Sequence, residues 1–178
     1  MPSCLRLIMS IVLIGYRGSG KTTIGQKLAD RLWQDLIDTD KLIVKKAGKS
    51  IKEIFEQDGE PRFRDLETEV VKEVCKLQDV VISLGGGAVL REENRAAIKD
   101  AGHKVIYLKC EPETLHKRIE ADASTSLMRP NLTQFQGIEE IERVLAEREP
   151  VYRGMMTGEL DVTNLSPEEA MVYIVRLL

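Results

Sequence analysis

The residues from Gly15 to Thr22 read Gly-Tyr-Arg-Gly-Ser-Gly-Lys-Thr, and they constrain the fold more than any other part of the chain. This run fits the phosphate-binding loop pattern G-x-x-x-x-G-K-[ST]. The apolar stretch Ile11–Ile14 before it predicts a buried strand, and Lys21–Leu32 after it predicts a helix. A strand, a glycine-rich loop and a helix in this order indicate a polyphosphate site rather than a chance turn.

The loop predicts how a polyphosphate would be held. Its glycines let the backbone fold so that N–H groups point inward, and the helix N-terminus adds a partial positive charge. We expect Lys21 to reach the β- and γ-phosphates and the Thr22 hydroxyl to ligate Mg²⁺. The nucleotide-binding residues expected here are Gly15, Gly18, Ser19, Gly20, Lys21, Thr22 and Thr23.

Composition narrows the class of protein. A chain of 178 residues with 43% hydrophobic and 31% charged residues suits one globular domain. The net charge of −3 argues against non-specific nucleic-acid binding, and no apolar run approaches the length of a membrane-spanning helix. Three widely spaced cysteines, Cys4, Cys75 and Cys110, without a C-x-x-C pair favour the reducing cytoplasm. Nothing requires more than a monomer.

Short apolar runs alternate with longer amphipathic stretches. Strands are expected at residues 10–14, 35–37, 80–84, 104–108 and 160–162. Helices are expected at residues 21–32, 40–46, 51–57, 62–77, 92–100, 113–120, 138–148 and 167–178. This alternation predicts an α/β fold, a parallel sheet with helices on both faces, in which ligands bind beyond the carboxyl ends of the strands.

Two carboxylates follow the second expected strand, in Asp38-Thr39-Asp40. One could hold a water of the Mg²⁺ shell, and the other could orient and deprotonate a hydroxyl nucleophile, as phosphoryl transfer requires. The alternative is an aspartate that caps the following helix. Beside a phosphate-binding loop we favour the chemical interpretation.

Arg62 and Arg64 lie near the start of a long expected helix, where the helix dipole prefers acidic residues. An arginine there could instead hold a carboxylate with two parallel hydrogen bonds, braced by Glu67 three residues after Arg64. The alternative is a solvated charged helix face, which this segment taken alone favours.

Further along the chain, glycines and arginines gather after expected strands. Gly85-Gly86-Gly87 ends the third strand and indicates that backbone closely approaches a ligand. Arg118, Arg129 and Arg148 add positive charge, and the polar, aperiodic residues 121–137 predict a mobile lid. For each single arginine, a surface salt bridge is the alternative.

Three other residues are expected to be structural. Trp33 is expected to pack at the end of the first helix. His103 and His116 are isolated and have no metal-ligand spacing, so they indicate ordinary core or surface positions.

Together these segments resemble the shikimate kinase family, from about Met9 to the C-terminus. The phosphate loop alone is shared with very many ATPases and GTPases. The combination of D-T-D at 38–40, F-R at 63–64 and L-G-G-G-A-V at 84–89 is much more selective. The other matching parts are residues 24–25, residues 51–55, Gly59, residues 129–130, Arg148, Pro150 and Tyr152.

The resemblance implies a fold and an activity. The fold would be a single three-layer P-loop kinase domain over residues 1–178, like the nucleoside monophosphate kinases, with a five-stranded parallel sheet. A substrate-binding helical region would occupy about 40–78 and a lid about 119–137. The activity would be transfer of the γ-phosphate of ATP, with Mg²⁺, to the 3-hydroxyl of shikimate, in the pathway to chorismate and aromatic amino acids.

The resemblance also assigns roles by position. Lys21, Asp40 and Arg129 would be catalytic: Asp40 would bind the ring hydroxyls and act as base or positioner, and Arg129 would be a lid arginine on the phosphates. Asp38 would contact Mg²⁺, mostly through water. The remaining assignments are Arg64 and Arg148 to the shikimate carboxylate, Gly86 and Gly87 to the substrate through backbone, Arg118 and Pro167 to the adenine, and Ile51, Phe55 and Phe63 to the pocket wall.

The chain departs from the family pattern in two places. The segment between Arg118 and Arg129 is longer than in many relatives, and Asn131-Leu132 stands where two apolar residues are usual. Two other functions stay open at this point. One is a kinase for another small molecule, such as gluconate or a nucleoside monophosphate. The other is a non-catalytic sensor, whose expected mark, a damaged Lys21, Thr22 or Asp40, is missing here.

Overall fold

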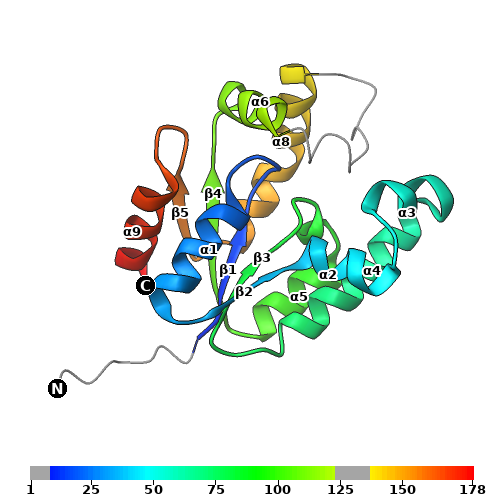
Figure 1. Cartoon of the computed structure of the whole chain (residues 1–178), viewed down its shortest axis with the longest axis horizontal. Helices are drawn as coiled ribbons and strands as arrows, with labels where there is room; N and C mark the ends of the chain where they lie inside the picture. Colours follow the sequence, from blue (N-terminus) through cyan, green and yellow to red (C-terminus); the bar gives the residue numbers. More distant parts are fainter. Residues whose placement is uncertain (1–8, 123–136) are drawn as a thin grey trace.

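The computed structural model describes residues 9–122 and 137–178 of the chain. Within them, five parallel strands form one sheet in the order β2-β3-β1-β4-β5 (Figure 1). The strands are β1 (Ile11–Ile14), β2 (Asp35–Asp38), β3 (Val80–Ser83), β4 (Lys104–Lys109) and β5 (Gly158–Asp161). The expected five-stranded parallel sheet is thereby confirmed.

Strand β1 lies at the centre of the sheet, between β3 and β4, and all four of its residues are buried. Leu13 is in register with Ser83 of β3 and with Ile106 of β4. Because all strands run the same way, the segments that follow β1, β2 and β3 emerge at one edge of the sheet.

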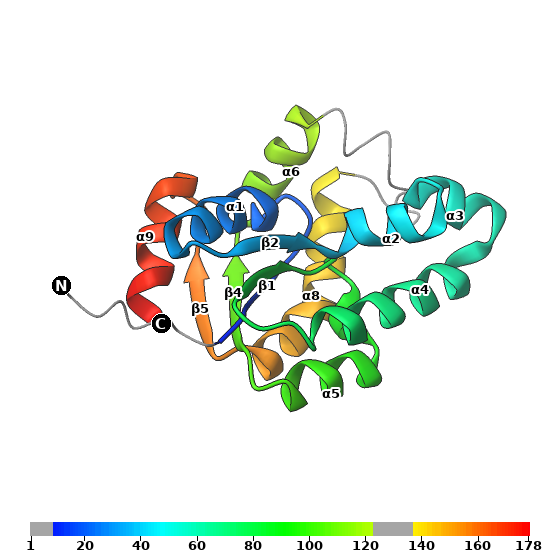
Figure 2. The same cartoon turned by 60° about the horizontal axis from the view of Figure 1, so that its bottom comes forward.

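Helices cover both faces of this sheet. They are α1 (Lys21–Leu32), α2 (Thr39–Ala47), α3 (Ile51–Gln57), α4 (Gly59–Val74), α5 (Glu92–Asp100), α6 (Pro112–Ala121), α8 (Gly137–Met155) and α9 (Pro167–Leu177), with a short 3₁₀ helix, η1 (Ala88–Leu90). Figure 2 shows α1 and α9 together on one face, and α4 and α5 on the other.

Alternate residues of β1 face the two layers, as the strand repeat requires. Val12 and Ile14 join a core cluster with residues of α2 to α5 and the end of α8, including Ile54 and Tyr152. Ile11 and Leu13 join a second cluster with α1 and α9. The three-layer arrangement therefore has two cores separated by the sheet.

Two helix starts carry reciprocal capping boxes, at α3 and at α9. Ser50 accepts from the Glu53 N–H and the Glu53 carboxylate accepts from the Ser50 N–H; Ser166 and Glu169 repeat the arrangement. Pro167 occupies the first helical position of α9, where a missing N–H has no cost. These local signals fix where both helices begin.

Some expected boundaries were wrong. Strand β5 lies at Gly158–Asp161 rather than at 160–162, and α4 begins at Gly59 and ends at Val74. Helix α8 continues to Met155 instead of ending at residue 148. It runs through Pro150 because burial of Tyr152 and Met155 in the core outweighs the lost backbone hydrogen bond.

The expectation for Trp33 was also wrong. The residue is 92% exposed, and it ends α1 in the left-handed conformation, with φ of 57°. Within residues 9–122 and 137–178, no helix combines the length and the apolar character needed to cross a membrane.

Candidate active site

The phosphate loop, residues 15–22, joins the end of β1 to the start of α1. Gly15, Gly18 and Gly20 all have positive φ, at 145°, 83° and 91°. A Cβ on Gly15 would lie 2.7 Å from the Leu108 carbonyl oxygen of neighbouring strand β4. These conformations and this close approach require glycine, so the sequence pattern follows from the backbone path.

Lys21 reaches back across the loop. Its Nζ donates to the carbonyl oxygens of Gly15, at 2.8 Å, and Tyr16, at 2.9 Å. The ammonium group is thus held over the loop by backbone acceptors while lining a pocket on the solvent side. A single positive charge in this place suits the terminal phosphates of a nucleotide.

Thr22 and Asp38 join the loop to the end of β2. The Thr22 hydroxyl donates to Asp38 Oδ2 at 2.7 Å and lies 3.4 Å from Ser83 Oγ. The other oxygen, Asp38 Oδ1, accepts from the N–H groups of Asp40 and Lys41 at the start of α2. Asp38 therefore caps α2, as the alternative interpretation held, and its second oxygen still faces Thr22.

This pair fits a magnesium ion better than a transition metal. In the described residues no group of three or more His, Cys, Asp and Glu side chains could hold a metal ion. A hydroxyl and a carboxylate beside a phosphate loop are the oxygen donors that Mg²⁺ takes when phosphates and water complete its shell. Thr22 and Asp38 are the residues that would hold it.

Two adjoining pockets open at the carboxyl edge of the sheet. The first pocket has an empty volume of about 530 Å³, its open mouth included, which is in the range of small-molecule sites. Its lining residues are Arg17, Asp40, Ile51, Phe55, Phe63, Arg64, Glu67, Gly85, Gly86, Gly87 and Arg148. It combines two neighbouring aromatic rings, tilted by 41° to each other, with cationic side chains and carboxylates.

The aromatic and cationic sides of the first pocket come from different elements. The rings of Phe55 and Phe63, from α3 and α4, lie with centroids 4.8 Å apart. Arg64 follows Phe63 on α4, while Arg148 comes from α8 and is buried. An acceptor with a planar apolar part and an acidic group matches this lining.

Arg64 is held by two carboxylates. Its Nη1 donates to Glu67 Oε2 at 2.7 Å, and its Nε and Nη2 donate to Glu60 Oε1 at 3.2 Å. The expectation that Glu67 braces Arg64 is confirmed. Burial raises the pKa of Glu67 above its ordinary value, against the opposing effect of Arg64. Arg62, by contrast, is half exposed and pairs with Glu69 outside the pocket.

Gly85, Gly86 and Gly87 bring backbone close to functional side chains. A Cβ on Gly85 would lie 2.9 Å from Asp40 Oδ1, and one on Gly87 would lie 2.7 Å from Arg64 Nη1. A Cβ on Gly86 would approach the Gly15 carbonyl oxygen to 3.3 Å. The three glycines are therefore explained by close approach and not by unusual φ.

Thr39 is a functional neighbour that the sequence analysis missed. Its buried hydroxyl donates to the Ser83 carbonyl oxygen at 3.3 Å and accepts from the Gly85 N–H at 3.0 Å. It thereby ties the ends of β2 and β3 together and fixes the glycine segment beside Asp40. Its position between two aspartates was the only signal in the sequence.

The second pocket is larger, with an empty volume of about 1080 Å³ that includes open solvent, as expected for a nucleotide-sized site. Its lining residues are Arg17, Gly18, Gly20, Lys21, Thr22, Thr23, Ile24, Asp40, Ser83, Leu84, Gly86, Arg118, Ile119, Asp122, Leu165 and Pro167. Arg118 Nη2 donates to the Val162 carbonyl oxygen at 2.9 Å, which holds its guanidinium against the wall.

Arg17, Asp40 and Gly86 line both pockets and so mark where the two meet. Arg17 was missed because it occupies a free position of the loop pattern. Its Nε is buried and has no hydrogen-bond partner among the residues that the structure describes. An arginine at this junction adds positive charge where an anionic group would cross from one pocket to the other.

The structure brings together most of the expected site residues. Six line only the first pocket: Ile51, Phe55, Phe63, Arg64, Gly87 and Arg148. Seven line only the second: Gly18, Gly20, Lys21, Thr22, Thr23, Arg118 and Pro167. Asp40 and Gly86 line both. Gly15 and Ser19 lie in the loop but line neither pocket, and Asp38 lies behind Thr22. Arg129 lies outside the described residues.

Comparisons with known proteins identify relatives over nearly the whole chain. A family model described as "Shikimate kinase" matches residues 17–178. A shikimate kinase of Thermobifida fusca is 42% identical over 94% of this chain and 93% of its own length. One from Enterococcus faecalis is 43% identical over 95% of this chain and 98% of its own length.

A solved structure supports the same grouping. The structure described as shikimate kinase from Acinetobacter baumannii in complex with shikimate matches this fold with a TM-score of 0.89 at 31% identity. The match covers 97% of this chain and 93% of that chain.

Proposed function

Because this chain belongs to the shikimate kinase family, we propose that its two pockets divide the two substrates of that reaction, shikimate in the first and ATP in the second. A shikimate kinase transfers the γ-phosphate of ATP to the 3-hydroxyl of shikimate, giving shikimate 3-phosphate and ADP. This reaction is a step of chorismate and aromatic amino acid biosynthesis.

One observation carries the assignment of the pockets. Asp40 lies on the wall that the pockets share, with Arg64 and Arg148 on one side and Lys21 on the other. In-line phosphoryl transfer requires an acceptor hydroxyl and a terminal phosphate on the two sides of one such point. A carboxylate at that point is placed to serve the hydroxyl.

The first pocket suits shikimate. Arg64 and Arg148 would bind the carboxylate through their guanidinium groups, which present parallel N–H donors. Phe55 and Phe63 would contact the ring, and the backbone of Gly86 and Gly87 would meet substrate oxygens. Arg64 keeps its orientation through Glu60 and Glu67, so little side-chain freedom is lost on binding.

The transfer step follows from these positions. The 3-hydroxyl oxygen forms a bond to the γ-phosphorus while the bond between that phosphorus and the β–γ bridging oxygen breaks. The hydroxyl proton passes to Asp40, and Lys21 stabilises the negative charge that moves onto the bridging oxygen. Mg²⁺, held by Thr22 and by Asp38 through water, would neutralise charge on the β- and γ-phosphates.

The remaining nucleotide contacts are proposals of the same kind. Gly15, Gly18, Ser19, Gly20 and Thr23 would contribute to the phosphate loop, and Arg118 and Pro167 would lie against the adenine. Their support is that Arg118, Leu165 and Pro167 line the second pocket and not the first. Arg129 would contact the transferring phosphates, and it lies outside the described residues.

We also propose a division of the chain into functional regions. Residues 40–78 would bind the acceptor, which is supported by the presence of Ile51, Phe55, Phe63 and Arg64 in the first pocket. Residues 119–137 would form a lid; of these, residues 123–136 lie outside the described part of the chain. Both pockets are built from one chain, which supports a monomer, and the free thiols of Cys75 and Cys110 support a place in the cytoplasm.

The test is a coupled assay of ADP release with Mg²⁺-ATP, with and without shikimate, on the wild type and the Arg148→Lys variant. Lysine loses the forked donor pair, so we expect a higher KM for shikimate with little change in the KM for ATP. Arg143→Lys, an exposed position on the same helix, is the matched control and should behave like the wild type. An unchanged KM in Arg148→Lys would contradict the carboxylate contact.

A substrate panel separates the open alternatives. Family membership sets aside a gluconate or nucleoside monophosphate kinase, and intact Lys21, Thr22 and Asp40 do not suit a non-catalytic sensor. Turnover of another acceptor far faster than shikimate would overturn the substrate assignment while leaving the nucleotide site in place.

A further inference from the structure

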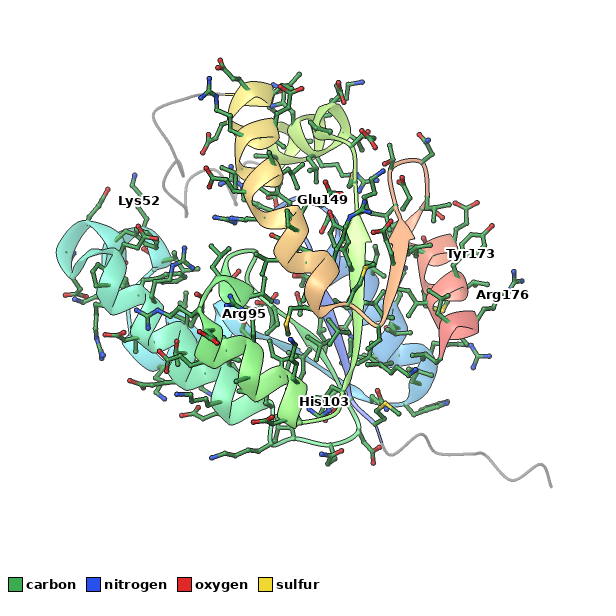
Figure 3. All side chains as sticks on the ribbon, turned by 180° about the vertical axis from the view of Figure 1, so that it is seen from behind. Lys52, Arg95, His103, Glu149, Tyr173 and Arg176 are labelled. Atoms are coloured by element: carbon green, nitrogen blue, oxygen red, sulfur yellow. The ribbon has the colours of Figure 1, made fainter. Side chains whose placement is uncertain are left out.

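Tyr152 connects helix α8 to the glycine segment of the first pocket. Its hydroxyl donates a 2.6 Å hydrogen bond to the Gly86 carbonyl oxygen, across a sequence separation of 66 residues. The Tyr152 side chain is completely buried. Arg148 lies one turn earlier on the same helix and lines the pocket. In Figure 3, Glu149, the neighbour of Arg148, marks this part of α8.

The bond to Gly86 also sets the direction of a second backbone group. The Gly86 carbonyl and the Gly87 N–H belong to one peptide plane, and the described residues contain no cis peptide bond. In a trans peptide both groups lie in the peptide plane and point in opposite directions. A hydroxyl that holds the carbonyl therefore fixes where the N–H points.

Among residues 9–122 and 137–178, no hydrogen bond uses the Gly87 N–H. Gly87 lines the first pocket, and a Cβ on it would lie 2.7 Å from Arg64 Nη1. A backbone donor beside a guanidinium group is a suitable contact for an anionic oxygen.

The same hydroxyl meets Arg148. Arg148 lies near the Tyr152 hydroxyl, where its positive charge opposes the effect of burial on the pKa of Tyr152, and its Nη1 lies 3.7 Å from where a Cβ of Gly86 would be. A phenol can donate one hydrogen bond and accept others. It can therefore give its proton to Gly86 and accept from Arg148 at the same time.

The ring itself is rigidly held. Tyr107 of β4 stacks on Tyr152 with centroids 5.1 Å apart and an angle of 29° between the ring planes. Burial raises the pKa of Tyr152 to about 12, so its hydroxyl keeps its proton throughout the physiological range. Because the ring is held in place and the hydroxyl keeps its proton, this hydroxyl can always donate its hydrogen bond.

We propose that Tyr152 is a positioning residue for the acceptor, because its one hydroxyl aligns the Gly86–Gly87 peptide and the Arg148 guanidinium toward the same anionic group. This inference rests on the proposed function of the first pocket. It adds a residue that does not touch the acceptor. It also joins two proposed acceptor contacts, one from the glycine segment after β3 and one from α8.

The test compares Tyr152→Phe with the wild type in the coupled assay, with each substrate varied in turn. Loss of one buried hydrogen bond predicts a KM for shikimate that rises about threefold to tenfold, with the KM for ATP unchanged. Tyr107→Phe is the matched control, since it removes a hydroxyl from the same ring pair without touching Gly86. We expect it to keep wild-type values.

Two results in the variant would overturn the inference. One is an unchanged KM for shikimate in Tyr152→Phe while Arg148→Lys raises it, which leaves the proposed function intact. The other is a rise of both KM values together with a lowered melting temperature, which would make Tyr152 a packing residue only. If Arg148→Lys also leaves the KM for shikimate unchanged, the carboxylate contact of Arg148 in the proposed function is wrong.

A measurement on the unmodified protein covers the case in which the variant fails to fold. Amide hydrogen exchange at Gly87 is followed in the wild type with and without saturating shikimate. Slower exchange of the Gly87 N–H on binding supports its alignment toward the acceptor. Equal exchange in the two samples would overturn it.

Discussion

Thr22 Oγ1 lies 2.7 Å from Asp38 Oδ2, so the last residue of the phosphate loop is hydrogen-bonded to the last residue of β2. The bond joins the segment after β1 to the carboxyl end of β2, and these two strands lie on either side of β3 in the sheet. It brings together a hydroxyl and a carboxylate that the sequence separates by sixteen positions. The proposed magnesium site depends on this one contact.

Asp38→Asn should separate the two roles of this carboxylate, which are capping α2 and carrying the negative charge beside Thr22. Asparagine caps a helix about as well as aspartate, so we expect a melting temperature close to that of the wild type. It removes the negative charge beside Thr22, so turnover should require a higher Mg²⁺ concentration. Mg²⁺ titration of the activity checks this. Asp35→Asn, at the exposed start of the same strand, is the control. Parallel loss of activity and stability would show that capping is the main task.

Asp40→Asn should damage catalysis far more than nucleotide binding. The variant cannot accept the hydroxyl proton, and loss of such a base lowers kcat by roughly 10²- to 10⁴-fold. ATP affinity, measured by calorimetry, should stay close to the wild-type value. Asp65→Asn, which alters an exposed carboxylate on α4, serves as control. Collapse of ATP affinity with surviving turnover would mean that Asp40 has another role.

Gly87→Ala should disturb the acceptor pocket by displacing the side chain of Arg64. The new Cβ would lie 2.7 Å from Arg64 Nη1, so the guanidinium must move away from its place beside Gly87. We expect a higher KM for shikimate with a modest loss of stability, since the displaced atoms end a flexible side chain. Steady-state kinetics and thermal unfolding give the two readings.

Gly154→Ala is the matched control for that substitution. Gly154 lies in α8, and a Cβ there would meet nothing within 4 Å. Alanine should raise the free energy of unfolding by about 0.5–1 kcal/mol and leave both KM values unchanged. An equal rise of the KM for shikimate in both variants would contradict the local explanation.

His103 should make the fold sensitive to mild acid. It is buried, lies at the amino end of β4 away from the phosphate loop (Figure 3), and its Nε2 is 3.1 Å from the Cys75 carbonyl oxygen. Burial lowers its pKa below 6.5, against a smaller opposing effect of that hydrogen bond. The unfolded chain therefore binds a proton at higher pH than the folded protein does. Stability from this group is present above pH 6.5 and falls as the pH decreases through the range just below it.

Urea unfolding at a series of pH values checks this prediction. The His103→Gln variant has no imidazole to protonate. Its free energy of unfolding should therefore fall less than that of the wild type as the pH decreases below 6.5. Identical slopes for His103→Gln and the wild type would show that His103 does not report on folding in this range.

Local patterns predicted most of the fold. The run Ile11–Ile14 and the repeats of α1 and α9 each depend on residues close in sequence, and so do the capping boxes at Ser50 and Ser166. The pairing of Arg64 with Glu67 was also predictable, because three residues on a helix bring two side chains to one face. Each of these features depends only on residues within one or two helical turns of one another.

The ends of helices and the exposure of single side chains were less predictable. Helix α8 passes Pro150 because Tyr152 and Met155 are buried in a core whose other residues come from distant elements. Trp33 is exposed because the chain turns at the end of α1 to enter β2. Sequence rules weigh local propensity, and in both places the packing of remote segments outweighs it.

By itself, the sequence determined a parallel α/β fold with a phosphate loop, and it indicated Asp38, Asp40, Arg64 and Arg148 of the candidate site but not Arg17. Only the tertiary structure decided that Arg17, Asp40 and Gly86 mark the junction of two pockets. It also decided that Thr39 ties β2 to β3 and that Tyr152 holds Gly86. These contacts join residues far apart in the chain, and sheet order and helix packing, not local pattern, set which of them meet.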